Sequence, residues 1–384
     1  MSLSRRTFIR LIGSSTVVFA AASVSCTTKP SSSGPLAPWR DAGIDYGDPR
    51  INALSYAILA PNPHNRQPWQ AQLSGDDDVL IFCDLEKLLP ETDPFNRQIV
   101  IGLGCFLELF KLSAQEAGYI AEITPFPLGE PQPYLDSRPV ARIRMVKSAE
   151  TTGDSLFQHV FQRRSNKEPF DTSMPVTDDT LAALTADKYE GVSLRSSNRA
   201  DDVATLSSLT WRAHELEVLS PAKLMESVNL MRIGSAAIEA SPDGIDLGGM
   251  AMEIMKRVRL ISHESLADPS SIAFKQGLDI YRALHGSAMA HVWLVTENNS
   301  RLAQLQSGAA WLRINLKAAG LGVDAHPISQ ALQEFPEMSA LYTELHETLG
   351  IVEGSTVQML GRLGYGPALA PSPRWPVMAV LKQA

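Results

Sequence analysis

One stretch of the chain combines a rigid backbone with side chains that could hold a flat polar ring. Residues 60–69 read Ala-Pro-Asn-Pro-His-Asn-Arg-Gln-Pro-Trp. Its three prolines prevent a continuing helix and leave the loop little backbone entropy to lose. The amides of Asn65 and Gln67 carry both donors and acceptors, which suits the mixed edge of a heterocycle. On composition alone, an ordinary proline-rich connection between a helix and a strand is an equally good interpretation.

A second stretch concentrates positive charge. Residues 161–170 read Phe-Gln-Arg-Arg-Ser-Asn-Lys-Glu-Pro-Phe, so Arg163, Arg164 and Lys167 lie close to the hydroxyl of Ser165. Clustered cations repel one another unless they face solvent or a compact anion. A solvated face is the usual explanation of such a run, and the residues alone leave both interpretations open.

The helix before the proline-rich loop has clear start signals. Asp48 can cap it, and Pro49 suits its first position. Ile51, Leu54 and Ile58 then form one apolar stripe. The loop is therefore expected to leave a packed helix.

Strand and helix patterns follow along the rest of the first half. Residues 70–74 and 79–83 resemble the strands of a hairpin, and residues 104–117 carry one apolar face as a helix. Residues 142–145 alternate as a half-buried strand before a polar break at residues 147–153. This break is the expected boundary between two halves of the chain.

An internal repeat relates two distant parts of the chain. Residues 104–118 and 308–322 share the same glycine spacing and apolar stripe, and Pro125 or Pro327 follows each of them. With a helix and a loop before both copies, the pattern indicates two diverged copies of one fold. The chain is therefore predicted to be a pseudo-dimer fused into one polypeptide.

Composition excludes several classes of function. The chain has 384 residues, of which 44% are hydrophobic and 20% charged, as in an ordinary globular protein. Its net charge of −8 argues against a nucleic-acid partner, so any phosphate site must be local. The sequence holds no clustered metal-binding histidines, serine-hydrolase elbow or P-loop. Cys83 and Cys105 lie in apolar segments, where we expect them to be buried and to bind no metal.

The N-terminus is predicted to be an export signal. Residues 4–10 read Ser-Arg-Arg-Thr-Phe-Ile-Arg and precede a mildly apolar run over residues 11–24. They resemble a twin-arginine signal, which implies recognition by the twin-arginine export machinery and a periplasmic or cell-envelope location. A basic amphipathic helix is the alternative. Cys26 ends a segment that resembles a lipoprotein box, so a lipid anchor there is weighed against cleavage by an ordinary signal peptidase.

Several segments together resemble the nitroreductase superfamily of FMN enzymes, in particular its Acg-like branch. They are the Asn-x-Gln-Pro-Trp loop at residues 65–69, the Arg-Arg-Ser segment at 163–165, the loop at 323–330, and closing segments at 361–366 and 372–376. The resemblance covers nearly everything from Asp48 onwards. It implies an α+β nitroreductase fold, internally duplicated, with one non-covalent FMN between the halves.

The resemblance also implies which residues hold FMN. The Asn65 loop would contact the flavin ring, the cations near Arg163 and the C-terminal Arg374 would bind the phosphate, and main-chain N–H groups after Pro327 would reach flavin N5 and O4. No side-chain acid or base is required, because FMN carries the chemistry. The predicted cofactor-binding residues are Asn65, Arg66, Gln67, Arg163, Arg164, Ser165, Lys167, Pro327, Ile328, Ser329, Gln330 and Arg374.

The predicted organisation joins a signal and two halves. Residues 1–37 are the signal and tether, 38–150 the first nitroreductase-like half, and 151–384 the second. Residues 220–285 are rich in methionine and suit a lid over the flavin, although a methionine stripe is more often core.

The predicted function is hydride transfer through flavin N5. The electron donor is a small molecule such as NADPH, and the acceptor is a nitroaromatic- or quinone-like compound. The alternative is a non-catalytic protein that binds or stores FMN beneath a closed lid. In either case the chain is expected to function as a monomeric pseudo-dimer.

Overall fold

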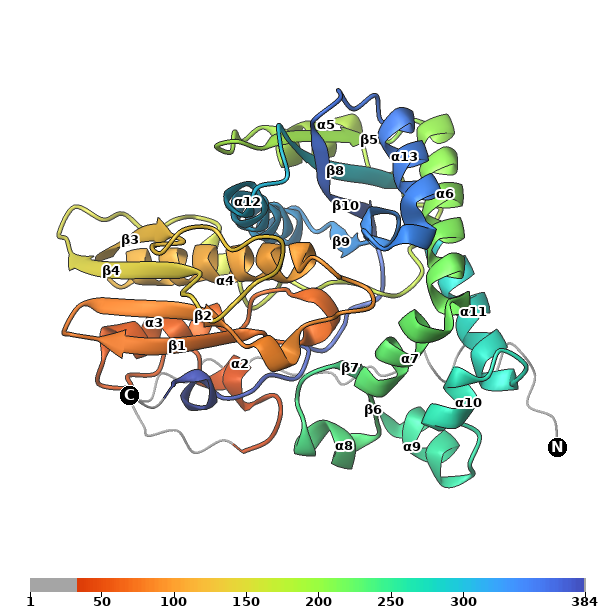
Figure 1. The fold of residues 1–384 in the computed structure, drawn as a ribbon, viewed down its shortest axis with the longest axis horizontal. Helices are drawn as coiled ribbons and strands as arrows, with labels where there is room; N and C mark the ends of the chain where they lie inside the picture. The colour runs from red at the N-terminus through yellow and green to blue at the C-terminus, as the bar shows by residue number, and fades with distance from the viewer. Residues whose placement is uncertain (1–32, 383–384) are drawn as a thin grey trace.

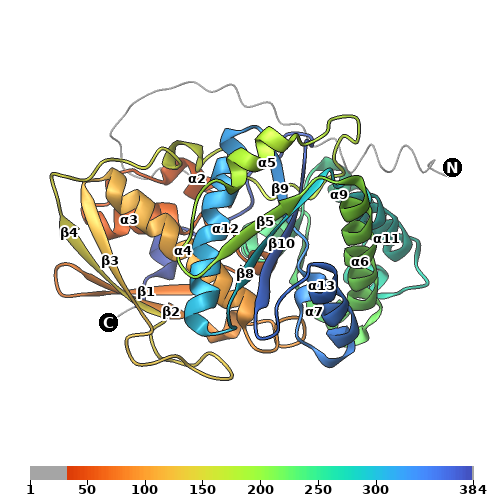
Figure 2. The same ribbon diagram turned by 90° about the horizontal axis from the view of Figure 1, so that it is seen from above.

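The computed structural model describes residues 33–382 and contains two four-stranded antiparallel sheets. The first half of the chain forms the sheet β1-β2-β4-β3, and the second half forms the sheet β5-β8-β10-β9. Helices α4 and α12 lie between the two sheets (Figure 1; Figure 2 shows the same arrangement from above). The α+β class expected from the sequence is confirmed.

Each half has its own set of elements. The first half comprises α2 (Ala37–Asp41), α3 (Pro49–Ala57), η1 (Pro63–Asn65), β1 (Trp69–Ser74), β2 (Asp78–Cys83), α4 (Arg97–Glu116), β3 (Tyr119–Pro125) and β4 (Ala141–Lys147). The second half comprises α5 (Asp178–Thr185), β5 (Ser193–Ser197), β8 (Ala290–Thr296), α12 (Arg301–Gly320), β9 (Asp324–Pro327), η4 (Gln330–Leu332), α13 (Ser339–Thr348) and β10 (Thr356–Gly364). An insert between β5 and β8 comprises α6 (Ala200–Leu219), α7 (Pro221–Leu230), β6 (Met231–Ile233), α8 (Ser235–Ala240), β7 (Ile245–Leu247), α9 (Met250–Arg257), α10 (His263–Ala267) and α11 (Ile272–His285).

The two sheets have the same connectivity. In each sheet the first two strands pair, a 20-residue helix follows, the third strand takes the edge, and the fourth strand inserts between the second and the third. Every neighbouring pair is antiparallel. This equivalence is what a duplication would produce, and the duplication itself stays a prediction.

The two halves meet where α4 crosses α12. A Cβ on Gly104 would come within 3.0 Å of the carbonyl group of Leu305, and a Cβ on Gly308 would come equally close to the carbonyl oxygen of Ile101. The backbones can approach this closely only because both residues lack a side chain. The two glycines marked by the repeat therefore form the helix contact between the halves. The thiol of Cys105 is buried in the same contact, 3.1 Å from Gly308 O.

Both central helices begin earlier than the sequence patterns predicted. α4 begins at Arg97 instead of near Gly104, because the carboxylate of Asp93 accepts hydrogen bonds from the N–H groups of Gln98 and Ile99, each at 3.0 Å. α12 begins at Arg301, where the hydroxyl of the preceding serine accepts from a first-turn N–H. Helix starts fixed by such capping contacts extend beyond the apolar stripe that predicted them.

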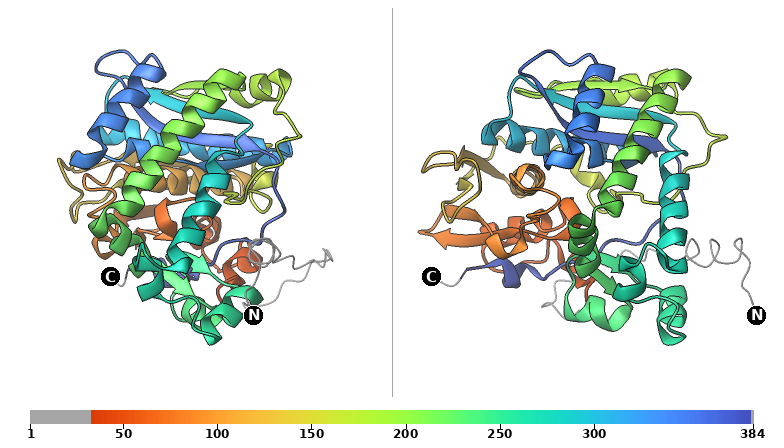
Figure 3. Two further views of the ribbon diagram at one scale, coloured as in Figure 1. Left: turned by 90° about the vertical axis from the view of Figure 1, so that its right-hand side faces the viewer. Right: turned by 45° about the vertical axis from the view of Figure 1, so that its right-hand side comes forward.

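The insert packs on the second sheet and reaches the first half (Figure 3). Glu226 of α7 accepts hydrogen bonds from Glu91 N at 2.9 Å and Thr92 N at 3.0 Å. Within the insert, Met252 and Met255 are buried in a small core of its own. These two methionines are thus core residues, as the commoner interpretation of the stripe expected.

Candidate functional site

The proline-rich loop has an unusually strained backbone. His64, Asn65 and Gln67 all have left-handed φ angles, of 49°, 51° and 51°. Such conformations cost a non-glycine residue about 1–3 kcal/mol each, and they persist where the surrounding structure fixes them. Part of that fixing comes from Asn62, whose Oδ1 accepts from Gln67 N at 2.7 Å. Strain of this kind favours a functional role for the loop over that of a simple connection.

The two amides predicted to contact the ring bind other parts of the protein. Gln67 is fully buried, with Nε2 donating to Pro242 O at 2.7 Å and Oε1 accepting from Trp375 N at 2.9 Å. Asn65 Nδ2 donates to Pro373 O at 3.1 Å. The loop is therefore bonded to the insert on one side and to the C-terminal segment on the other.

Two buried arginines come together beneath this loop. Arg163 Nη2 and Arg374 Nη2 both donate to Leu59 O, at 3.5 and 3.4 Å. Arg374 also donates from Nε to Ile58 O at 2.9 Å and from Nη1 to Asn65 Oδ1. In the described part of the chain neither arginine forms an ion pair, and the carboxylate of Asp246 acts on Arg374 only through its charge.

The electrostatics of these arginines indicate an anion site. Burial and the charge of Arg164 lower the pKa of Arg163 to about 10. Burial and the charge of Arg163 lower the pKa of Arg374 to about 9, although Asp246 opposes this shift. Arg163 Nη1 is buried without a hydrogen-bond partner. An unpartnered buried guanidinium nitrogen is costly, and a phosphate would satisfy it and offset both charges.

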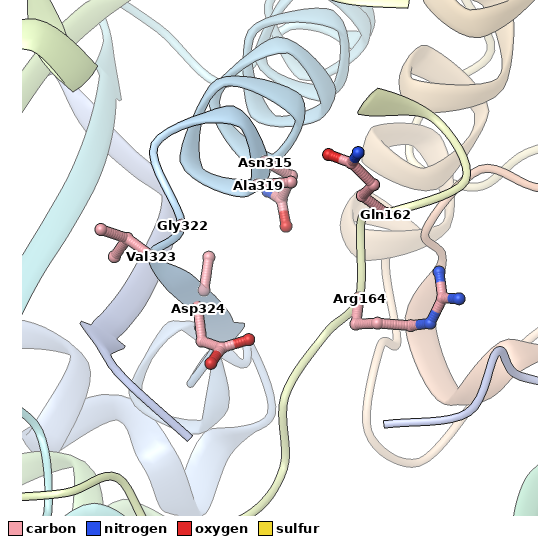
Figure 4. A pocket seen from close by; sticks show the side chains of 8 residues that line it. Gln162, Arg164, Asn315, Ala319, Gly322, Val323 and Asp324 are labelled. Carbon is pink, nitrogen blue, oxygen red and sulfur yellow. The ribbon is translucent and has the colours of Figure 1, made fainter. Parts of the chain in front are cut away.

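The rest of the cationic segment is divided between two environments. The guanidinium of Arg164 lies 5.0 Å from the centre of the Trp39 ring and lines a separate pocket of about 150 Å³. Figure 4 shows Arg164 and Gln162 on one wall of that pocket and Asp324 on the opposite wall. Ser165 instead pairs through its backbone with Ala325, the residue after Asp324.

Lys167 is exposed, yet it is close enough to influence the pKa of titratable groups on three elements. Its charge contributes to lowering the pKa of His64 and of His326, after the larger effect of burial in each case. Burial raises the pKa of Asp246 in β7, and Lys167 and Arg374 oppose that shift. Asp246 keeps exposed surface, although desolvation is the largest cause of its raised pKa.

The predicted reactive loop follows β9. Ile328 is buried, and its N–H donates to Leu360 O at 2.9 Å. Gln330 begins η4, and its Oε1 is buried without a partner. Among the described residues no hydrogen bond or ion pair joins residues 327–330 to Asn65 or Arg163. The described chain therefore gathers Asn65, Arg163 and Arg374 directly, and joins the cationic segment to β9, which leads into the Pro327 loop, through the backbone pairing of Ser165 with Ala325.

The insert covers the proline-rich loop. Gly244 N donates to Asn65 O at 3.1 Å, and Arg66 Nη1 lies 3.2 Å from Asp243 Oδ2. Sequence reasoning did not assign Asp243, Asp246 or Trp39 to the site, because each is distant in sequence from the motifs and carries no local pattern. The pair Asp243-Gly244 is a turn signal in the sequence. Nothing in that signal predicts that Asp243 forms an ion pair with Arg66.

Comparisons with known proteins give similarity over most of the chain, although no protein-family model matches it. The chain is 25% identical over 334 residues to the protein named "Putative NAD(P)H nitroreductase Rv3131" of Mycobacterium tuberculosis, covering 84% of this chain and 87% of that protein. It is 34% identical over 76 residues to "Putative NAD(P)H nitroreductase acg" of the same organism, covering 20% of this chain and 23% of that one.

Solved structures with some likeness include two FMN proteins. One is the FMN-dependent nitroreductase NfnB from Mycobacterium smegmatis in complex with NADPH, with a TM-score of 0.37, 16% identity, and coverage of 59% of this chain and 96% of that one. Another is a nitroreductase with bound FMN from Bacteroides fragilis, with a TM-score of 0.32, 16% identity, and coverage of 56% and 91%. Across most of its length, the chain is similar in sequence to proteins named as NAD(P)H nitroreductases.

Proposed function

We propose that this chain is an FMN-dependent oxidoreductase of nitroreductase type. The observation that carries the proposal is the pair of buried guanidinium groups at Leu59 O, one of which has an unpartnered nitrogen. The similarity to Rv3131, a protein named as an NAD(P)H nitroreductase, supports the same conclusion. A nicotinamide donor and a nitroaromatic or quinone acceptor are the substrates proposed.

The chain's own residues would divide the work of holding FMN. Arg163 and Arg374 would bind the phosphate, with Lys167 as a further cation nearby. The strained loop at Asn65 would position the ring, and the main-chain N–H groups of Ser329 and Gln330 would donate to its reactive edge. When bound, FMN supplies hydride transfer, and the protein supplies orientation and exclusion of water.

One FMN per chain is the proposed stoichiometry. The equal strand orders of the two sheets and the glycine crossing of α4 and α12 support a pseudo-dimer within one monomeric chain. The ring-contacting loop lies in the first half, whereas Arg163, the residue 327–330 loop and Arg374 lie in the second. The chain therefore offers one complete set of these segments between the halves.

A second candidate function is storage of FMN without turnover. It is favoured by the hydrogen bonds of Gln67 Nε2 to Pro242 O and of Gly244 N to Asn65 O, which close the insert over the loop. In this arrangement both the nitrogen and the oxygen of the Gln67 amide are bonded to other parts of the protein. Turnover would then require the insert to move.

The test is anaerobic spectroscopy of the purified chain. A flavin band equivalent to one FMN per chain, bleached by NADPH and restored by a nitroaromatic or quinone, is expected. No bound FMN after reconstitution would overturn the proposal. A flavin that NADPH leaves oxidised in the intact chain, yet reduces when residues 220–285 are trimmed, would establish the storage function instead.

A further inference from the structure

A buried polar cluster lies between the insert and the second sheet. His214 and Glu217 lie three residues apart on α6, and Tyr281 and His285 lie four residues apart on α11, so each pair shares a helix face. The rings of His214 and Tyr281 are stacked with centroids 4.2 Å apart, and His214 and His285 are 5.5 Å apart. The two insert helices thus bring chemically active groups together inside the protein.

Several atoms of this cluster have no hydrogen-bond partner. Both ring nitrogens of His214 and the Oε2 of Glu217 are buried and unpartnered, and each of these residues is only 5% exposed. Gln330 Oε1 and Gln333 Oε1, at the two ends of the η4 turn, are also buried and unpartnered. Buried polar atoms nearly always have a hydrogen-bond partner, so this group of unpartnered atoms indicates a binding site for a polar ligand.

The cluster adjoins the loop that the proposed function assigns to the reactive edge of the flavin. Gln330 belongs to that loop, and Gln333 hydrogen bonds to the side chain of Glu217. The charges of His214 and His285 also act on His326, which lies directly before the loop. The insert therefore does not only cover the proline-rich loop. It also places polar side chains near the end of β9.

We propose that Glu217 supplies the proton that an oxygen-terminated acceptor, such as a quinone, takes up during its reduction, and that His214 hydrogen bonds to the acceptor oxygen. The inference rests on the proposed function and deepens it. With a hydride supplied by reduced FMN, the quinone would take its proton from the Glu217 carboxyl, which would give the hydroquinone. The carboxylate that remains takes a proton back from solvent, so atoms and charges balance.

The titration behaviour of the two groups suits these roles. Burial, together with the charge of Glu226 on α7, raises the pKa of Glu217 to about 7, and the hydrogen bond with Gln333 opposes the shift. A group with a pKa near the working pH is an effective proton donor that is also readily recharged. Burial lowers the pKa of His214 to about 4, so its ring is neutral and can donate from one nitrogen. Tyr281 of α11 is buried near the carboxyl, and the charge of Glu217 adds to burial in raising the pKa of the tyrosine.

The first test measures reoxidation of the dithionite-reduced flavoprotein in stopped flow. With 2-methyl-1,4-naphthoquinone as acceptor, Glu217→Gln should slow reoxidation at least tenfold and abolish both its pH dependence near neutrality and its solvent deuterium effect. Ferricyanide removes electrons without taking up a proton, so it should reoxidise the variant and the parent at the same rate. Glu215→Gln is the matched control, because Glu215 lies on the same helix but is half-exposed and faces Arg282. Equal quinone rates and pH profiles for Glu217→Gln and the parent would overturn the inference.

The second test needs no flavin chemistry. Trp211 lies 5.9 Å from His214, so quinone binding in the cluster should quench its fluorescence in flavin-free protein. His214→Ala should weaken the quinone affinity at least fivefold. Trp211→Phe should lose the quenching, which would identify Trp211 as its source. Quenching that is identical in the parent and His214→Ala would reject the acceptor site, even if the flavin measurements succeed. Absence of bound FMN would reject the proposed function, and this titration would still decide the quinone site.

Discussion

Arg66 and Asp243 join the proline-rich loop of the first half to the insert of the second. Arg66 Nη1 lies 3.2 Å from Asp243 Oδ2, and Arg232 Nη2 lies 3.0 Å from the other carboxylate oxygen. Burial alone would raise the pKa of Asp243, but hydrogen bonds from Ser241 and Arg232 and the charges of both arginines lower it overall. An ionised carboxylate therefore holds the insert on the loop at neutral pH.

Replacing this carboxylate should release the insert. In Asp243→Asn we expect amide hydrogen exchange in residues 231–247 to speed up at least tenfold, because two partly buried cations lose their counter-charge. Mass spectrometry of the exchanged peptides measures this. Asp187→Asn, which breaks the more exposed pair with Lys317, is the control and should leave these peptides unchanged.

The same contact should respond to acid. Because the pKa of Asp243 is lowered in the fold, its contribution to folding stability is complete above the ordinary pKa of 3.8 and is lost as the pH falls below that value.

Exchange in residues 231–247 that stays slow in Asp243→Asn would mean that Pro242 and Gly244 hold the insert without this ion pair.

The crossing of the two central helices should tolerate no added methyl group at Gly308. Gly308→Ala places a Cβ against the Ile101 carbonyl and the Gly104 backbone, so the helices must separate, and we expect a loss of about 1–3 kcal/mol in unfolding free energy. Gly277→Ala in α11 is the matched control, since its Cβ meets no atom within 4 Å. It should be neutral or stabilising by up to about 1 kcal/mol in the same urea titrations. Equal stability of the two variants would contradict the close crossing.

Local signals predicted the parts of the fold whose causes lie close together in sequence. Asp48 caps α3 through Arg50 N, with Pro49 in its first turn, as expected. The hairpin of β1 and β2 and the burial of both described cysteines are also confirmed. In each case the residues that specify the structure are neighbours or form one periodic stripe.

The remaining parts depend on contacts between distant residues. Gln67 was expected to face a ligand on the strength of its motif, yet its amide bonds to Pro242 and Trp375, which no local pattern connects to it. The early start of α4 similarly depends on Asp93, outside the helix. By contrast, Arg163 and Arg374 are adjacent in the fold, as expected only from the family resemblance. Their role toward FMN stays a prediction.

Removing both arginines should abolish FMN binding. Each charge-assisted hydrogen bond to a phosphate is worth about 1.5–3 kcal/mol, so Arg163→Ala with Arg374→Ala should weaken the affinity at least 100-fold. Titration of flavin-free protein with FMN, followed by quenching of flavin fluorescence, gives the dissociation constant. Arg142→Ala with Arg144→Ala removes two exposed cations and should leave the affinity unchanged. Similar losses in both double variants would mean that net charge, and not this site, attracts the cofactor.

We further propose that the chain is exported through the twin-arginine route, with Arg5 and Arg6 as the recognised pair. Both lie outside the described residues, as does Cys26. Changing both to Lys keeps the charge but removes the pair, and should leave the protein in the cytoplasm. Cell fractionation tests this, with Arg10→Lys as the control. Unimpaired export of the double variant would contradict the proposed route, and the mass of the mature N-terminus would show whether Cys26 is acylated.

The buried histidines should make the fold sensitive to mild acid. His291 is fully buried, with neither ring nitrogen partnered, and burial together with the charge of Arg362 lowers its pKa to about 3. It is thus neutral in the folded state, whereas in the unfolded chain it binds a proton below its ordinary value of 6.5. The unfolded state therefore binds more protons than the folded state between these two values, and stability falls as the pH is lowered through that window.

The size of this effect can be isolated with one substitution. Each such histidine contributes a slope of at most about 1.4 kcal/mol per pH unit, so His291→Phe should reduce the slope of unfolding free energy between pH 6 and pH 4 by about that amount. Urea titrations at a series of pH values measure it. Cys83→Ala is the control, because it alters the buried core but removes no group that titrates in this window. It should shift stability equally at every pH. A slope that is the same in His291→Phe and the parent would mean that the ring of His291 is not held neutral in the folded protein.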